Sequence, residues 1–113
     1  MKRIPIFAFS ALVTLGLILP LSLSSAENKK AAEGEAVYKK NCNMCHFPNK
    51  TDSKFGPGLK GLFKDKELPE SHKPVTDAAV REQIEKGSKS MPGFGKRLSK
   101  KQIDNLMKYL KTL

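Results

Sequence analysis

A five-residue motif, Cys42-Asn43-Met44-Cys45-His46, constrains this chain more than any other feature. The pattern C-x-x-C-H is typical of covalent haem c attachment. On one helical turn, residues three apart face the same side, so both thiols can reach the vinyl groups of one porphyrin as thioethers. His46 lies on the same face, where its imidazole can bind the iron as the proximal ligand. The motif therefore predicts one haem c, attached through Cys42 and Cys45.

Two other roles for these residues fit the sequence less well. A thioredoxin-like dithiol requires C-x-x-C beside a βαβ pattern, and no such pattern is visible. A structural zinc site needs four ligands, but the only other Cys or His in the chain is His72. The two cysteines also lie too close together to form a disulfide framework.

The N-terminal segment is typical of an export signal. Two cations precede an apolar stretch over residues 4–23, and a small-x-Ala cleavage pattern ends at Ala26. The stretch is also long enough to cross a bilayer if it is not cleaved, so a membrane anchor is the alternative. Pro20 favours cleavage, because it separates the hydrophobic part from the small residues. We therefore predict a periplasmic location.

Cleavage would divide the chain into a signal peptide, residues 1–26, and one small domain, residues 27–113. That domain keeps only four Phe and two Tyr and has no Trp. A chain of this length buries about 60% of its surface, so its core alone is marginal. A haem would supply the missing apolar mass, and we expect the chain without haem to be largely unfolded.

The chain is strongly basic, with a formal net charge of +10. Its cations occur all along the sequence, so no nucleic-acid-binding arm stands out and no nucleic-acid partner is expected. The charge is consistent with a solvated surface, with steering towards an acidic redox partner, or with loose attraction to an anionic membrane. Salt would weaken both attractions.

Three helices are expected in the mature domain. Good helix formers occupy residues 29–43 and lead into the motif. Thr76 and Gly87 are the predicted start and stop of a second helix. Ser99 with Gln102 forms a capping box before the third. That helix places four apolar residues on one face: Ile103, Leu106, Met107 and Leu110.

Little regular structure is expected between Phe47 and Val75, where four Pro and three Gly occur. So long an irregular segment is unusual in a compact domain. It is reasonable if the segment wraps a haem and packs apolar side chains against it. We expect this of Phe55, Leu59, Leu62 and Phe63.

In this order the elements resemble class I c-type cytochromes over nearly all of the mature sequence. In that family the first helix ends in C-x-x-C-H and packs a small residue against an aromatic of the last helix, which Gly34 with Tyr38 and Tyr109 match. Gly56-Pro57-Gly58-Leu59 resembles the loop whose proline carbonyl accepts a hydrogen bond from the proximal histidine, a role implied for Pro57. The resemblance implies an all-α fold of three or more helices around one covalently bound haem.

The sixth iron ligand has four candidates in the sequence. Met44 lies inside the attachment motif, Met107 is on the apolar face of the last helix, and His72 lies in a polar stretch. Met91 instead begins Met91-Pro92-Gly93-Phe94, which resembles the family's distal methionine segment. We predict that His46 and Met91 are the axial ligands.

Six-coordinate iron has no open position for substrate, and a soft thioether favours its reduced state. We therefore predict an electron carrier, not an enzyme. Its partners would be redox proteins with acidic docking surfaces, and it would be a monomer, although a dimer remains an alternative. Five cations are expected to rim the exposed haem edge: Lys54, Lys60, Lys89, Lys96 and Arg97.

Two other functions remain open at this point. One is a cytochrome subunit of a larger redox enzyme, for which an exposed apolar patch would be the clue. The other is a ligand-binding or catalytic haem protein with a labile sixth ligand. Arg81 and Glu85 precede the Met91 segment, but both are expected on a solvated helix face.

Overall fold

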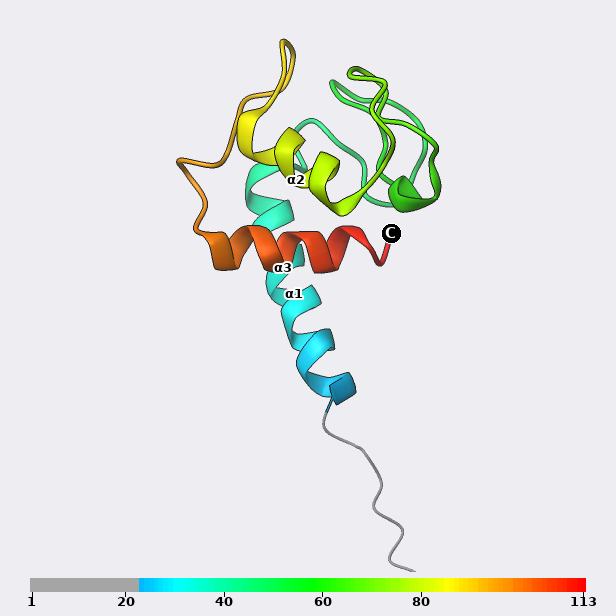
Figure 1. Cartoon of the computed structure of the whole chain (residues 1–113). Helices are drawn as coiled ribbons and strands as arrows, with labels where there is room; N and C mark the ends of the chain where they lie inside the picture. The colour runs from blue at the N-terminus through cyan, green and yellow to red at the C-terminus, as the bar shows by residue number, and fades with distance from the viewer. Residues whose placement is uncertain (1–22) are drawn as a thin grey trace, which may run out of the picture.

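The computed structural model describes residues 23–113, which form helices and loops and contain no β-strand. Helix α1 spans Leu23–Asn41, α2 spans Asp77–Lys86 and α3 spans Lys100–Leu110; a short 3₁₀ helix, η1, spans Leu62–Lys64. In Figure 1, α3 crosses α1, and α2 and the loops lie on one side of that crossing. The described chain thus has the all-α architecture that the sequence predicts.

The close approach of α1 and α3 depends on Gly34. A Cβ built at this position would overlap the backbone oxygen of Asn105 and lie 2.9 Å from Cβ of Tyr109. One turn along α1, Tyr38 is buried, and its ring centroid lies 5.4 Å from that of Tyr109. Asn105 also donates a 2.6 Å hydrogen bond to Glu33. These contacts confirm the small residue and the aromatic pair implied by the resemblance.

Helices α2 and α3 begin at the residues that the sequence predicts. The Thr76 hydroxyl accepts a hydrogen bond from the backbone N–H of Ala79 at 3.1 Å. Ser99 Oγ accepts from the N–H of Gln102, while Oε1 of Gln102 accepts from the N–H of Ser99, which completes the capping box. Gly87 ends α2 with a positive φ of 71°, a conformation that glycine adopts without strain.

One hydrophobic core lies between the three helices. The predicted apolar face of α3 is buried in it, and α2 and the loops supply most of the remaining side chains. The buried apolar residues are Tyr38, Leu62, Leu68, Val80, Ile84, Phe94, Leu98, Ile103, Leu106, Met107 and Leu110.

Removal of the α3 capping box is expected to lower stability modestly. Ser99→Ala would leave the N–H of Gln102 without its side-chain acceptor, at a cost of about 1 kcal/mol in the free energy of unfolding. Denaturant unfolding of the haem-loaded protein measures the difference. Ser53→Ala is the control, because the Ser53 side chain makes no hydrogen bond with the described residues. An equal loss of unfolding free energy in Ser99→Ala and Ser53→Ala would contradict a stabilising role for the capping box.

The segment between the motif and α2 is irregular, as expected, with η1 as its only helix. Leu62 and Leu68 join the core, and Leu59 and Phe63 are partly buried against it. Phe55 is 83% exposed with respect to the rest of the chain, and its contact with the haem stays a prediction. It lies in a turn, in which the Lys54 N–H donates to the Gly56 carbonyl oxygen at 2.9 Å.

Helix α1 begins and ends earlier than the predicted range 29–43. At its end the Asn41 side chain donates to the Val37 carbonyl at 2.8 Å. Both Cys42 and Asn43 then bond through their N–H groups to the Tyr38 carbonyl. Because these bonds share one carbonyl, the regular i to i−4 pattern stops and the chain enters a turn.

The predicted signal peptide, residues 1–26, overlaps the start of α1. Its residues 1–22 lie outside the described residues, whereas 23–26 form the first turn of the helix. Cleavage after Ala26 would therefore remove that turn. Within residues 23–113, no helix combines the length and apolar character that a membrane span needs.

Candidate functional site

The C-x-x-C-H motif follows α1 as one further helical turn. The N–H groups of Cys45 and His46 both donate to the Cys42 carbonyl at 3.0 Å. Both cysteines are free and half-buried. Burial, with a smaller effect from Cys45, raises the pKa of the Cys42 thiol to about 11. Reactive redox dithiols have a lowered pKa instead, so this environment disfavours the thioredoxin-like alternative.

The His46 ring is fixed by the loop that follows the motif. Its Nδ1 lies 2.8 Å from the Pro57 carbonyl oxygen, the contact implied by the resemblance. A carbonyl only accepts hydrogen bonds, so Nδ1 carries the proton and Nε2 keeps its lone pair for a metal. On the backbone side, the Tyr38 hydroxyl donates to the His46 carbonyl at 2.6 Å. A Cβ built at Gly56 would lie 2.5 Å from Cε1 of the ring, so this position has no room for a side chain.

Backbone hydrogen bonds keep this loop in register with the motif. The Gly56 N–H donates to the Cys45 carbonyl and the Leu59 N–H to the Phe47 carbonyl, both at 2.8 Å. Lys54 Nζ reaches the Asn43 carbonyl at 3.0 Å. The position of Pro57 under His46 is thus set by contacts on both of its sides.

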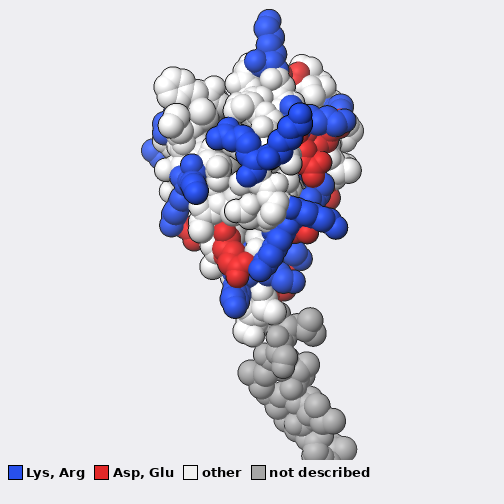
Figure 2. Space-filling view, turned by 90° about the vertical axis from the view of Figure 1, so that its left-hand side faces the viewer, with Lys and Arg blue, Asp and Glu red and all other residues white. Residues whose placement is uncertain are grey.

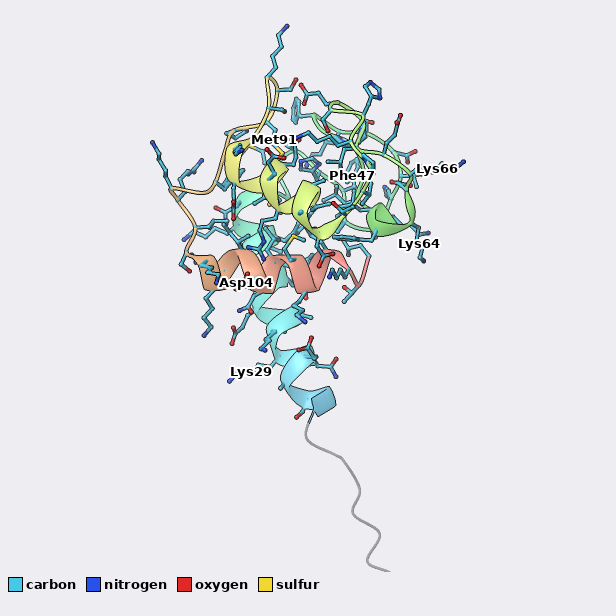
Figure 3. The ribbon with its side chains drawn as sticks, viewed as in Figure 1. Lys29, Phe47, Lys64, Lys66, Met91 and Asp104 are labelled. Carbon is cyan, nitrogen blue, oxygen red and sulfur yellow. The ribbon has the colours of Figure 1, made fainter. Side chains whose placement is uncertain are left out.

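Met91 lies in the connection between α2 and α3, and we call residues 87–95 of that connection the Met91 loop. Its side chain is partly buried against the core. Gln83 Nε2, on the last turns of α2, lies 3.7 Å from the Met91 sulfur and donates to it. In Figure 3, Met91 and Phe47 lie above α3, whereas Lys29 lies below it on α1. Gln83 was not among the predicted site residues, because its spacing from Met91 matches no local pattern.

The other candidates for the sixth ligand have different surroundings. Met107 is buried in the core and Met44 is 77% exposed beside the motif. His72 is exposed and pairs with Glu67 at 3.1 Å. Among the described residues, no three His, Cys, Asp or Glu side chains gather as a metal cluster, so a zinc site of that kind is not formed there.

The side chains at this site fit a haem. Two free thiols lie one helical turn apart, an imidazole nitrogen is left without a proton, and a partly buried thioether is held on another loop. Imidazole nitrogen and thioether sulfur are established axial donors to haem iron. The position next to the imidazole must be a glycine, because a side chain there would overlap the ring, and residue 56 is a glycine.

Comparisons with known proteins agree with this geometry. A family model described as "Cytochrome C oxidase, cbb3-type, subunit III" matches residues 29–110. The chain belongs to the class I c-type cytochromes. Cytochrome c6 of Limnospira maxima is 38% identical to this cytochrome over 88 residues, which cover 70% of this chain and 88% of that protein. Cytochrome c6 of a Synechococcus species is 31% identical over 110 residues, which cover 97% and 91%.

A larger protein also shares part of this sequence. The dihydro-heme d1 dehydrogenase of Pseudomonas aeruginosa is 34% identical over 98 residues, which cover 85% of this cytochrome but only 18% of that enzyme. No solved structure matches the chain at a significant level. As a member of its family, this cytochrome carries one covalent haem c and transfers single electrons.

Proposed function

We propose that Cys42 and Cys45 hold the haem as thioethers and that His46 and Met91 are its axial ligands. Bound in this way, the haem supplies reversible one-electron exchange and no open coordination position. The observation that supports the proposal is the 2.8 Å contact of His46 Nδ1 with the Pro57 carbonyl, because it leaves Nε2 as the ring nitrogen available to bind a metal. Pro57 acts as the residue that orients the imidazole.

We further infer that the protein is not itself an enzyme. A catalytic haem site needs a free acid or base near the sixth position. The two candidates that the sequence offers on α2, Arg81 and Glu85, are in ion pairs: Arg81 lies 2.6 Å from Asp104 and 3.7 Å from Glu85. The segment over residues 1–26 supports export to the periplasm, where the domain over residues 27–113 would act.

The basic surface on the Met91 side supports an acidic partner. Residues 87–101 contain five cations and no acidic residue. Cations on the helices are often paired, such as Lys86 with Glu82 and Lys108 with Glu27. Figure 2, which views the left side of Figure 1, shows Lys and Arg side chains spread across that face. Positive potential on this side would steer a negatively charged protein towards the loop.

Exposed apolar side chains beside the motif complement this charge. Phe55 and Met44 are both largely exposed. Lys54 precedes Phe55 in the chain, and its Nζ lies 3.0 Å from the carbonyl oxygen of Asn43, the residue before Met44. We propose that a redox protein with an apolar contact surrounded by carboxylates docks here. The carboxylates of that partner would contact five cations of this cytochrome: Lys54, Lys60, Lys89, Lys96 and Arg97.

A cytochrome that is part of a larger redox assembly is the second candidate. The matching family model is described as an oxidase subunit, and the dehydrogenase relative is far longer than this chain. In that case the Phe55 region would be a permanent interface. Mass measurement of the natively purified protein distinguishes a free carrier from a subunit.

Reduction of an anionic oxidant such as ferricyanide is expected to slow several-fold as salt rises from about 0.01 M to about 0.5 M. Lys89→Gln/Lys96→Gln should slow the low-salt reaction and flatten its salt dependence. The control is Lys29→Gln, which removes a charge from α1 on the far side of α3 (Figure 3). Stopped-flow absorbance measures the rates. If Lys29→Gln slows the reaction equally, the electron does not leave through the surface around the Met91 loop.

A further inference from the structure

The tip of the Met91 loop, residues 88–90, is held less firmly than its base. At the base, Phe94 and Gly95 donate backbone hydrogen bonds to the last turn of α2, at 2.8 and 3.0 Å. Within the tip, the Ser88 N–H donates to the Met91 carbonyl at 2.8 Å, which closes the loop on itself. Ser88 and Ser90 are both exposed, so local bonds alone would leave this tip free to move.

One carboxylate from another segment reaches this tip. Glu70 accepts hydrogen bonds from both serine hydroxyls, from Ser88 at one oxygen and from Ser90 at the other, the latter at 3.4 Å. Within the described residues, these are the only side-chain hydrogen bonds that tie residues 88–90 to a distant part of the chain. The two bonded serines lie on either side of Lys89, and Ser90 directly precedes Met91.

Glu70 is presented by a well-anchored turn, residues 66–75. Leu68 is buried in the core, its N–H donates to the Lys73 carbonyl at 2.8 Å, and its carbonyl accepts from the N–H of His72 at 3.0 Å. His72 has a positive φ of 54°, which is uncommon for a residue with a side chain and here completes the turn. An isolated bridge between Glu67 and Pro74 closes the base.

A salt bridge joins this turn to α2. Lys73 Nζ lies 2.7 Å from a carboxylate oxygen of Glu82, whose other oxygen contacts Lys86 at 2.9 Å. Hydrogen bonds from Lys73 and then Lys86 lower the pKa of Glu82 to about 2, so that carboxylate stays ionised near neutral pH. The 66–75 turn is thus fixed both to the core and to the helix that carries Gln83.

We propose that Glu70 is a positioning residue for the sixth iron ligand: by holding Ser88 and Ser90 against the 66–75 turn, it keeps the Met91 thioether on the iron. The inference rests on the proposed ligation by Met91. We infer that the sulfur leaves the iron together with a movement of the Met91 loop away from α2, a movement that would break both bonds to Glu70. Loss of the carboxylate therefore favours the open loop without touching the iron site.

The experiment uses the ferric, haem-loaded protein and imidazole as a competitor for the sixth position. Glu70→Ala is expected to tighten apparent imidazole binding by about three- to tenfold, the effect of two modest hydrogen bonds. Asp65→Ala is the matched control, since it removes the same charge and its side chain bonds to none of the described residues. It should bind imidazole as the wild type does.

Two further variants separate the contact from the charge. Ser88→Ala/Ser90→Ala should reproduce the effect of Glu70→Ala at constant charge, and the triple variant should add nothing more. Glu70→Gln keeps an acceptor oxygen and should recover part of the wild-type behaviour. Unchanged imidazole affinity in Glu70→Ala, or an equal change in Asp65→Ala, would overturn the proposal.

The same preparations test the ligand assignment independently. Ferric iron bound to a thioether has a weak charge-transfer band in the red, which Met91→Ala should abolish. If Met91→Ala keeps that band, ligation by Met91 is wrong and the role of Glu70 is wrong with it. If the band is lost while Glu70→Ala binds imidazole as the wild type does, only the role of Glu70 is overturned.

Discussion

Reduced Met91→Ala protein is expected to bind carbon monoxide, and the reduced wild type is not. Alanine cannot coordinate iron, so the substitution opens the sixth position at the end of the Met91 loop. In the wild type the Met91 thioether, the proposed sixth ligand, accepts a hydrogen bond from Gln83 on α2, with a donor to sulfur distance of 3.7 Å. Carbon monoxide requires an open position on ferrous iron, so its binding reports directly on the sixth ligand.

The same substitution is expected to lower the reduction potential. A thioether stabilises ferrous iron, and water or hydroxide in its place stabilises the ferric form. We expect a fall of roughly 0.1 to 0.2 V, within the range of about 0.8 V over which axial ligands set haem potentials. Absorbance during a redox titration measures the change, and carbon monoxide difference spectra measure access to the iron.

Met44→Ala is the control for this pair of measurements. Met44 is 77% exposed and lies two residues before His46 in the sequence, so its loss removes a thioether near the haem without opening the proposed distal side. Like the reduced wild type, the reduced Met44→Ala protein should not bind carbon monoxide. Rapid carbon monoxide binding by the wild type would instead favour a ligand-binding or catalytic haem protein.

Local patterns predicted those parts of the fold that depend on local geometry. The spacing of Cys42, Cys45 and His46 needs only one helical turn, and the structure has that turn directly after α1. Thr76 and Ser99 cap the N–H groups of their own helices, so neighbouring residues were enough to identify them.

Contacts between distant segments were not predictable from the same patterns. Glu70 and Ser88 are 18 residues apart and meet only because Leu68 anchors one turn while α2 ends beside it. The turn that surrounds Phe55 likewise depends on backbone contacts that apolar character alone does not predict. The residue types in the sequence indicate which side chains could form a site, and the tertiary structure shows which of them lie close enough to do so.

Substitution of Gly34 is expected to have the largest effect on stability. A Cβ there would overlap the Asn105 carbonyl oxygen and lie 2.5 Å from its carbonyl carbon. Both are backbone atoms of α3, so no change of rotamer relieves the clash, and the two helices must separate. Separation would uncover Tyr38 and break its contact with Tyr109, whose ring centroid is 5.4 Å away.

We expect Gly34→Ala to lower the free energy of unfolding by about 2 to 3 kcal/mol, and Gly34→Val by more. Alanine gains up to about 1 kcal/mol of helix propensity over glycine, which offsets only part of the loss. Because a domain of this size has only about 5 to 15 kcal/mol of stability, Gly34→Val should populate unfolded chain even with the haem attached.

Ala36→Val is the matched control, since Ala36 lies on the exposed side of the same helix. Its cost should stay below about 1 kcal/mol, the range of helix propensity alone. Denaturant unfolding followed by far-ultraviolet circular dichroism compares the three variants with the wild type. If Gly34→Ala unfolds at the same denaturant concentration as Ala36→Val, then α1 and α3 can shift apart at little cost. The α1–α3 crossing would then not be what holds the C-x-x-C-H turn in place.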